Sequence, residues 1–240
     1  MPRRLARSRV SEDVPVAPVQ SAPLVHAPLV HAPLVLATRS AGKIRELTAL
    51  FAEHGIAVET LDDLGLAEEA AEERIECHDT FEANAEAKAR WFAARLPTRV
   101  VFAEDSGLMV DALGGAPGVH SKRWAQVAAS GSALDAGNNA ALLAALEGKH
   151  ERSARYVCVA VCVIGSTRWM GEGRTEGRIT AARRGSGGFG YDPYFESVEL
   201  GVTFGEASAA EKGRVSHRGR AVRALIAEGG ASLRARVRNA

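Results

Sequence analysis

The stretch LVLATRSAGKIRELTALFAEHG (residues 34–55) predicts a strand, a loop and a helix in direct succession. The apolar run LVLAT fits a buried strand, and Leu47, Leu50 and Phe51 then recur on one helical face. Gly55 is typical of a helix end. A loop that opens a helix presents unpaired backbone N–H groups at the positive end of the helix dipole, so RSAGK suits a phosphate group. The loop lacks the Walker A pattern, and an ordinary strand-to-helix turn is an equally good interpretation.

The residues before this stretch differ in kind from the rest. MPRRLARSR (residues 1–9) holds four arginines, and prolines then interrupt the chain so often that no apolar core of a signal peptide forms. Such proline density favours extended conformations, and three copies of an APLV repeat are too few to stack as a solenoid. We expect residues 1–32 to form a disordered arm and residues 33–240 to form the folded domain.

The composition indicates a globular protein that can bury a substantial core. The chain has 240 residues, of which 46% are hydrophobic and 25% charged, and no apolar run approaches the ~18–20 residues of a membrane span. The net charge of +1 gives no overall field that would attract nucleic acid or a membrane surface. We therefore expect neither as a partner.

The three cysteines, Cys77, Cys158 and Cys162, form an odd number and lack C-x-x-C spacing. This pattern fits a reducing compartment better than a disulfide framework, so we expect a cytoplasmic protein. Cys158 and Cys162 are expected to be small core residues on one face of a strand.

A second strand, IAVETL (56–61), and a second helix, FEANAEAKARWFAARL (81–96), are predicted on either side of an acid-rich segment. Phe81, Asn84 and Lys88 lie at i, i+3 and i+7 and so share one face of this helix. This face could line a cleft, although exposed Asn and Lys side chains are the more ordinary interpretation.

The next strand, RVVFAEDSGL (99–108), is predicted to be buried and to end in Glu104 and Asp105. In open α/β sheets, ligands bind at the carboxyl ends of the strands. If the chain turns at the following Ser-Gly, both carboxylates could reach a hard cation such as Mg²⁺. Alternatively, one of them could hold a water molecule as a general base.

The middle of the chain alternates between loops and regular elements. A Gly/Pro-rich loop (111–124) and a leucine-faced helix (134–148) come first, and RSARYVCVAVCVIG (152–165) predicts a long strand. The segment 168–185 alternates like a hairpin. This order of strands and helices predicts an α/β protein.

The segment GSGGFGYDPYF (185–195) combines glycines, aromatic residues and an aspartate, and it predicts a loop that closes on a flat ligand. Phe189 and Tyr191 could stack on a base, and Asp192 could accept hydrogen bonds from its N–H groups. The alternative is a turn whose aromatic side chains belong to the core. Further on, cationic side chains again precede an amphipathic helix in EKGRVSHRGRAVRAL (211–225).

A carboxylate site, two cationic loops and an aromatic loop together suggest a metal-dependent enzyme that acts on a nucleoside polyphosphate. Five segments resemble, in order, the motifs of the inosine triphosphate pyrophosphatase family, also called the Ham1 family, and they span residues 34–228. The five segments are LATRSAGKIREL, TFEANAEAKA, AEDSGLMVDALGGAPGVHSKRWA, GGFGYDPYF and EKGRVSHRGRA.

The resemblance implies an α/β fold with a long mixed β-sheet flanked by helices, in two lobes with a central cleft. It also implies hydrolysis of non-standard purine nucleoside triphosphates (dITP, ITP and XTP) to the monophosphate and pyrophosphate. Mg²⁺ is the implied cofactor, and a homodimer is the implied assembly.

The resemblance also assigns roles to individual residues. Asp105 matches the general base, and Glu76, Glu104 and Asp105 match acidic metal ligands. The residues that match substrate contacts are Thr38, Arg39, Ser40, Ala41, Gly42, Lys43, Lys88, Ser106, Phe189, Gly190, Tyr191, Asp192, Lys212, His217 and Arg218.

The chain departs from the family pattern in three places. Thr38-Arg39-Ser40 stands where Thr-Gly-Asn is common, and Arg39 could add a charge for the phosphates. Glu104 replaces a common Asp, and His120 replaces a Tyr. Two alternatives remain open: a purine nucleotide binder without catalysis, and a pyrophosphatase with a different nucleotide preference.

Overall fold

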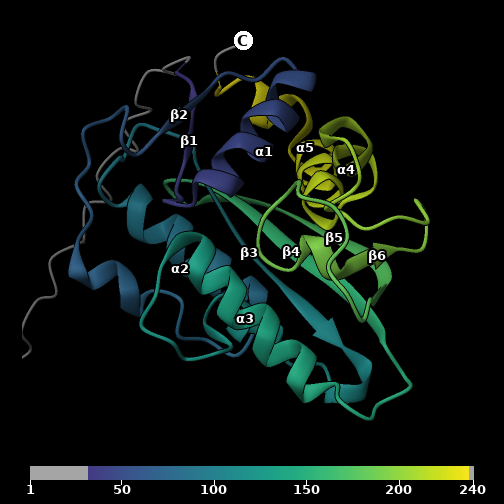
Figure 1. Ribbon diagram of the computed structural model, residues 1–240. Coiled ribbons are helices and arrows are strands. Elements are labelled where there is room, and N and C mark those ends of the chain that lie inside the picture. Colours follow the sequence, from purple (N-terminus) through teal and green to yellow (C-terminus); the bar gives the residue numbers. More distant parts are fainter. Residues whose placement is uncertain (1–31, 238–240) are drawn as a thin grey trace, which may run out of the picture.

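The computed structural model describes residues 32–237, so the expected disordered arm lies, except for its last residue, outside the described residues. A six-stranded sheet with the strand order β2-β1-β3-β4-β5-β6 forms the centre of the fold (Figure 1). β1 pairs in parallel with β2 and β3, and the remaining pairs are antiparallel. The strands are β1 (Leu34–Leu36), β2 (Val58–Thr60), β3 (Val101–Val110), β4 (Ser153–Ile164), β5 (Thr167–Ile179) and β6 (Phe195–Ser197).

The helices cover both faces of this mixed sheet, which confirms the predicted α/β fold (Figure 1). They are α1 (Ala41–Glu53), α2 (Phe81–Ala93), α3 (Gly131–Ala145), α4 (Ala209–Val215) and α5 (His217–Arg234). Short 3-10 turns are η1 (Ala70–Arg74), η2 (Asp111–Leu113), η3 (Gly118–Arg123) and η4 (Asp192–Tyr194). In the described part of the chain, no helix is both long and apolar enough to cross a membrane.

Three clusters of buried side chains hold the layers together. One packs β1, β3 and β4 against α1 and α5 and includes Leu36, Phe102 and Leu225. The opposite face of the same strands packs against α2 and includes Val35 and Val101. Because neighbouring strand residues point to opposite faces of the sheet, the apolar residues of β1 contribute side chains to both clusters. The third cluster lies at the other end of β3 and β4 and forms the core of a second lobe.

Two glycines of β5 let α5 lie directly against the sheet. A Cβ atom at Gly173 would be 2.1 Å from the carbonyl oxygen of His217, and one at Gly171 would be 2.2 Å from that of Ala221. Any larger side chain would displace the helix. The glycines therefore fix where the first residues of α5 stand over the sheet.

Two predictions about the strands were wrong. β3 does not end at Glu104 and Asp105 but continues to Val110, and Gly107 marks a close approach of η3 rather than a turn. A Cβ at Gly107 would be 2.2 Å from the carbonyl oxygen of Gly118. The segment 168–185 is not a hairpin, because β5 is continuous and the hairpin joins it to β4.

Candidate functional site

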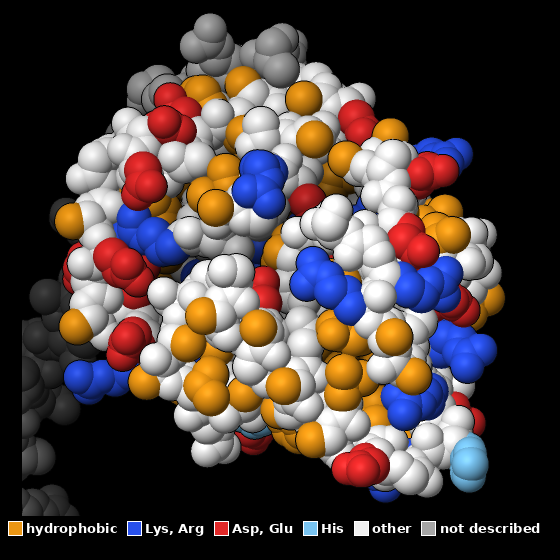
Figure 2. Space-filling view, in the orientation of Figure 1, with side chains coloured by type: hydrophobic (Ala, Val, Ile, Leu, Met, Phe, Trp, Pro, Cys, Tyr) orange, Lys and Arg blue, Asp and Glu red, His pale blue; other side chains and the backbone are white. Residues whose placement is uncertain are grey.

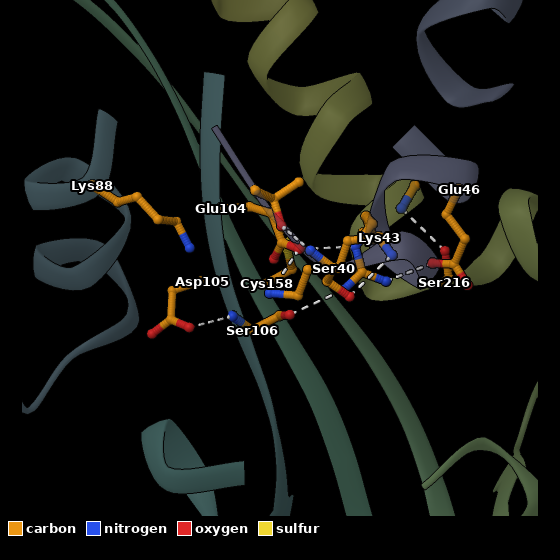
Figure 3. Close-up of polar contacts among 12 residues, drawn as sticks. Ser40, Lys43, Glu46, Lys88, Glu104, Asp105, Ser106, Cys158 and Ser216 are labelled. Carbon is orange, nitrogen blue, oxygen red and sulfur yellow. Dashed lines mark hydrogen bonds and ion pairs between the residues drawn. The ribbon is translucent and has the colours of Figure 1, made fainter. Parts of the chain in front are cut away.

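The site lies where the start of α1, the middle of β3, α2 and the α4–α5 junction meet. Because β3 is extended at Glu104 and Asp105, their side chains point to opposite sides of the sheet. Figure 3 shows Asp105 on the side of Lys88 and Glu104 on the side of Lys43. Two adjacent acids thus enter two different environments.

Glu104 is a buried carboxylate that two cations neutralise. Its Oε1 lies 3.0 Å from Lys43 Nζ and 3.1 Å from Arg218 Nε, and its Oε2 accepts a hydrogen bond from the thiol of Cys158 at 3.3 Å. Burial alone would raise the pKa of Glu104, but the charges of Arg218 and Lys43 outweigh it and hold the pKa well below its ordinary value. Both oxygens are thus engaged by protein groups, and the assignment of Glu104 as a metal ligand stays a prediction.

Asp105 is only 7% exposed and faces α2. Its Oδ2 accepts from Asn84 Nδ2 at 3.0 Å, and its Oδ1 accepts from the backbone N–H of Ser106 at 2.9 Å. Burial raises the pKa of Asp105 to about 6, the charge of Lys43 opposes this rise, and that of Glu76 adds to it. Asn84 is itself held by the backbone of His78. The result is an oriented carboxylate whose pKa suits a general base near neutral pH.

Basic side chains lie near this carboxylate and near Glu76. Lys88 of α2 forms an ion pair with Glu76. Lys122, at the end of the Gly/Pro-rich loop, has its pKa lowered mainly by burial, and the nearby charges of Lys43 and Lys88 add to this effect. The sequence marked Lys122 only as a flank of that loop, and its role shows only once the loop folds over β3.

The predicted phosphate loop is a helix start in the structure. Ser40 is the N-cap of α1, and its hydroxyl accepts a hydrogen bond from the backbone N–H of Lys43. The shorter hydroxyl that replaces the family's amide is thus a helix cap. A Cβ at Gly42 would be 2.6 Å from the ring of Phe189, so only glycine lets this aromatic side chain lie against the loop. Arg39 points elsewhere, toward the segment between β2 and α2.

A pocket of about 350 Å³ opens beside this loop, between α1, α4 and the segment 187–189. Phe189 and Lys212 line it together with Glu46. The Nζ of Lys212 lies 2.6 Å from Asp192 Oδ2 and 2.6 Å from Glu46 Oε1. The sequence reasoning missed Glu46, although it lies one helical turn after Lys43 and so shares its face of α1.

Tyr191 and Gly190 position the aromatic loop rather than line the pocket. The ring of Tyr191 belongs to the third core cluster, and its hydroxyl donates to the carbonyl oxygen of Ser121 at 2.8 Å. Asp135 and Asn139 of α3 bind the backbone N–H and carbonyl of Gly190. The alternative interpretation of core aromatics therefore applies to Tyr191, whereas Phe189 faces the pocket.

His217 and Arg218 begin α5, where Ser216 is the N-cap. Burial lowers the pKa of His217 well below its ordinary value, with the charges of Arg218 and Lys212 adding to this, so the imidazole is neutral. Its ring stacks on Tyr156, and among the described residues its buried Nδ1 has no hydrogen-bond partner. Arg218 also donates to the hydroxyl of Ser106 at 3.1 Å.

The acids predicted as metal ligands do not gather at one point. Within residues 32–237, no group of three or more His, Cys, Asp or Glu side chains is arranged to hold a metal ion. Asp105 and Glu76 nevertheless carry carboxylate oxygens, the donors that Mg²⁺ prefers, and the charge of Glu76 acts on Asp105. A positive ion beside them would relieve this repulsion.

A helix-opening anion loop beside a buried, oriented carboxylate places the chain among α/β proteins that bind nucleoside phosphates. A sequence model described as the Ham1 family matches residues 34–228. The chain belongs to the Ham1 family.

Similar proteins agree with this assignment. A dITP/XTP pyrophosphatase of Ralstonia nicotianae is 46% identical over 200 residues, which cover 80% of this chain and 93% of the relative. One of Geobacillus kaustophilus is 45% identical over 193 residues, covering 79% and 90% of the two chains. The solved structure of the Staphylococcus aureus Ham1 protein has a TM-score of 0.68 at 33% identity and covers 81% of this chain and 96% of its own.

Proposed function

We propose that this protein hydrolyses dITP, ITP and XTP to the nucleoside monophosphate and pyrophosphate. The observation that carries the proposal is Asp105, a buried carboxylate oriented by Asn84 and Ser106 beside the cationic phosphate loop. The names of the similar proteins, dITP/XTP pyrophosphatases, support the same activity. They lend no support to a binder without catalysis.

The triphosphate would bind along the N-terminus of α1. The N-terminus of α1 at Ala41 and Gly42 and the side chain of Lys43 supply positive potential there. Lys88 of α2 stands near Asp105, and its charge and that of Glu76 act on Lys122. These cations would stabilise the charge that develops during transfer at phosphorus.

Asp105 would act as the general base. It takes a proton from a water molecule, whose oxygen attacks the α-phosphorus. The bond between the α-phosphorus and its bridging oxygen then breaks, and pyrophosphate leaves with the electron pair. Glu104 instead keeps Lys43 and Arg218 in place.

Mg²⁺ would be held by Asp105 and Glu76 together with oxygens of the substrate. Mg²⁺ sites in nucleotide enzymes need only one or two carboxylates when phosphates complete the shell, so two protein ligands suffice. When bound, the ion neutralises charge on the phosphates and lowers the pKa of coordinated water.

The base would enter the pocket against Phe189. Lys212 and Arg218 have donors near it, and the buried Nδ1 of His217 has no partner among the described residues. Hypoxanthine and xanthine carry a carbonyl at C6, which donors can satisfy, whereas adenine presents an amino group there. An unpaired buried polar group costs about 1–3 kcal/mol, so two or three such contacts give discrimination on the order of a hundredfold.

The assembly and location are also proposed. The family resemblance supports a homodimer, which light scattering after gel filtration would detect. The cysteine pattern supports a cytoplasmic location.

The proposal is tested by incubating the protein with Mg²⁺ and each of dITP, ITP, XTP, dATP, dGTP and dCTP, and by measuring pyrophosphate. We expect release from the first three at rates about a hundredfold or more above that from dATP. Equal rates for all six would indicate a different nucleotide preference. Binding of dITP without any release would support the non-catalytic alternative.

A further inference from the structure

Arg39 is the second residue of the phosphate loop, yet its side chain turns away from the loop. Its Nη2 lies 2.9 Å from Glu72 Oε1, and its Nε lies 3.3 Å from Glu72 Oε2, so the two side chains form a bidentate pair. Its Nη1 also lies 3.1 Å from Asp62 Oδ1. The Arg39 side chain is 22% exposed and the Glu72 side chain 12%, so the pair is partly buried.

Two backbone carbonyls complete this set of contacts. Nη1 donates to Leu66 at 2.7 Å, and Nη2 donates to Ala67 at 3.0 Å. All four partners belong to one stretch, residues 62–76, which we call the acidic segment because it holds seven carboxylates. On the face drawn in Figure 2, acidic side chains gather along the left edge, where Figure 1 places the chain between β2 and α2.

The acidic segment carries a candidate metal ligand at its end. Glu76 forms an ion pair with Lys88 and lies close enough to Asp105 and Lys43 to influence their charges. The segment is largely irregular, with one short 3-10 turn (Ala70–Arg74). Its position relative to the phosphate loop therefore depends on contacts with neighbouring elements.

Arginine is better suited to these contacts with the acidic segment than other residues are. Its planar group has five donors in a fixed fork, which can satisfy a carboxylate in bidentate fashion and still reach two carbonyls. A lysine could supply the charge but not the fork. The glycine that is common at this position in the family would supply neither.

We propose that Arg39 is a positioning residue that ties the acidic segment to the phosphate loop and thereby fixes Glu76 beside Asp105. This inference rests on the proposed function, because Glu76 has a role only if it binds a metal ion for the hydrolysis. The role differs from a direct charge on the phosphates, since the donors of Arg39 are engaged by the segment.

The test compares Arg39→Ala, Arg39→Lys and Glu72→Gln with the wild type. Arg90→Ala is the matched control, because Arg90 pairs with Glu86 on the surface of α2 and touches neither the loop nor the segment. The first measurement is amide hydrogen exchange of residues 62–76 without metal or nucleotide. The second is the Mg²⁺ concentration that gives half-maximal pyrophosphate release from dITP, together with kcat and KM.

We expect Arg39→Ala to speed exchange in the acidic segment and to raise the half-saturating Mg²⁺ concentration, each by about tenfold, since charged hydrogen bonds are lost. In both measurements, Arg39→Lys should give values between those of the wild type and Arg39→Ala. Glu72→Gln should change both measurements in the same direction, although it leaves the charge of Arg39 in place. Arg90→Ala should change neither.

Three results would overturn the proposal. Normal exchange with lower activity would mean that Arg39 touches the phosphates directly, as would a Glu72→Gln variant with a normal Mg²⁺ requirement. Faster exchange with an unchanged Mg²⁺ requirement would mean that the contacts of Arg39 order the acidic segment but do not position Glu76. A wild type that releases no pyrophosphate would instead refute the proposed function, and the two failures are thus distinguishable.

Discussion

Glu104 and Asp105 are neighbours in the chain, yet the fold shifts the pKa values of their carboxyl groups in opposite directions. Burial acts on both, but Lys43 and Arg218 make direct ion pairs only with Glu104. Asp105 instead accepts hydrogen bonds from neutral groups, and the charge of Glu76 adds to the rise of its pKa. Two carboxylates with pKa values pushed apart are typical of an ionic anchor beside a general base.

We predict that Asp105→Asn lowers turnover but stabilises the metal-free protein. Loss of a positioned base lowers kcat by at least about a hundredfold. The pKa of Asp105 is about 6 in the folded protein against an ordinary value of 3.8, so folding favours its protonated form. That stabilisation is complete below pH 3.8 and is lost as the pH rises through about 6. At pH 7.5 the ionised, buried group therefore destabilises the fold.

Urea unfolding in EDTA, at about pH 7.5 and about pH 4, measures this effect. We expect the free energy of unfolding of Asp105→Asn to exceed that of the wild type by about 1–2 kcal/mol at the higher pH, allowing for one lost hydrogen bond. The gain should vanish at the lower pH. A variant with near-normal turnover would show that Asp105 is not the base.

A second residue-scale prediction concerns Lys212, whose side chain is 7% exposed between Asp192 and Glu46. Glu46 keeps Arg218 as a partner, but Lys212→Met leaves Asp192 buried without a cation. Breaking such a pair destabilises by about 3–5 kcal/mol, which urea unfolding at pH 7 would detect. Lys212→Met/Asp192→Asn should recover part of the loss. The exposed pair of Arg90 and Glu86 is the control, and its loss should change stability by no more than about 1 kcal/mol.

At the scale of elements, the sequence predicted where the helices lie, but it misjudged one strand end and one hairpin. The predicted helix at 81–96 begins at Phe81 as expected, whereas α1 begins at Ala41, inside the predicted loop, because the hydroxyl of Ser40 caps it. The prediction that β3 ends early was based on Gly107. A glycine can mark a turn, or it can let another backbone segment pack closely, and the sequence does not distinguish these two cases. Only the contact with η3 tells them apart.

The glycines of β5 lead to a prediction about α5. Gly173→Ala would put a methyl group 2.1 Å from the carbonyl oxygen of His217 and so push the start of α5 off the sheet. We expect a loss of about 1–3 kcal/mol in urea unfolding, together with a higher KM for dITP as His217 and Arg218 shift. Gly213→Ala in α4 is the control for stability. Its Cβ would meet Leu50 at 3.7 Å, so it should be neutral or stabilising by up to about 1 kcal/mol. Wild-type behaviour of Gly173→Ala would show that α5 can move freely over β5.

For the whole molecule, the motifs contain residues that the fold brings together, but they do not show which ion pairs those residues form. Lys43, Glu104 and Arg218 come from three distant parts of the chain and meet only because β3 lies beneath both α1 and α5. Ion pairs between such distant residues depend on side-chain direction. A sequence shows that side chains alternate between the two faces of a strand, but it does not show which residues contact them on each face. The ion pairs of Glu104 with Lys43 and Arg218, and of Arg39 with Glu72, could therefore not be predicted from the sequence.

The boundary of the domain gives the last prediction. Removing residues 1–31 keeps Ala32, with its bridge to Val237, and all of β1. We therefore expect unchanged thermal stability and unchanged pyrophosphate release from dITP. Removing residues 1–38 also deletes β1, whose three residues are fully buried between β2 and β3 and contribute to the clusters on both faces of the sheet.

The longer deletion should abolish folding, because a strand buried on both faces cannot be lost without exposing both clusters. Circular dichroism and thermal unfolding separate a folded, inactive protein from an unfolded one. Activity lost on the shorter deletion would mean that the proline-rich repeats contribute to the enzyme. A folded product of the longer deletion would mean that β3 can pair without β1, and the parallel half of the sheet would then be dispensable.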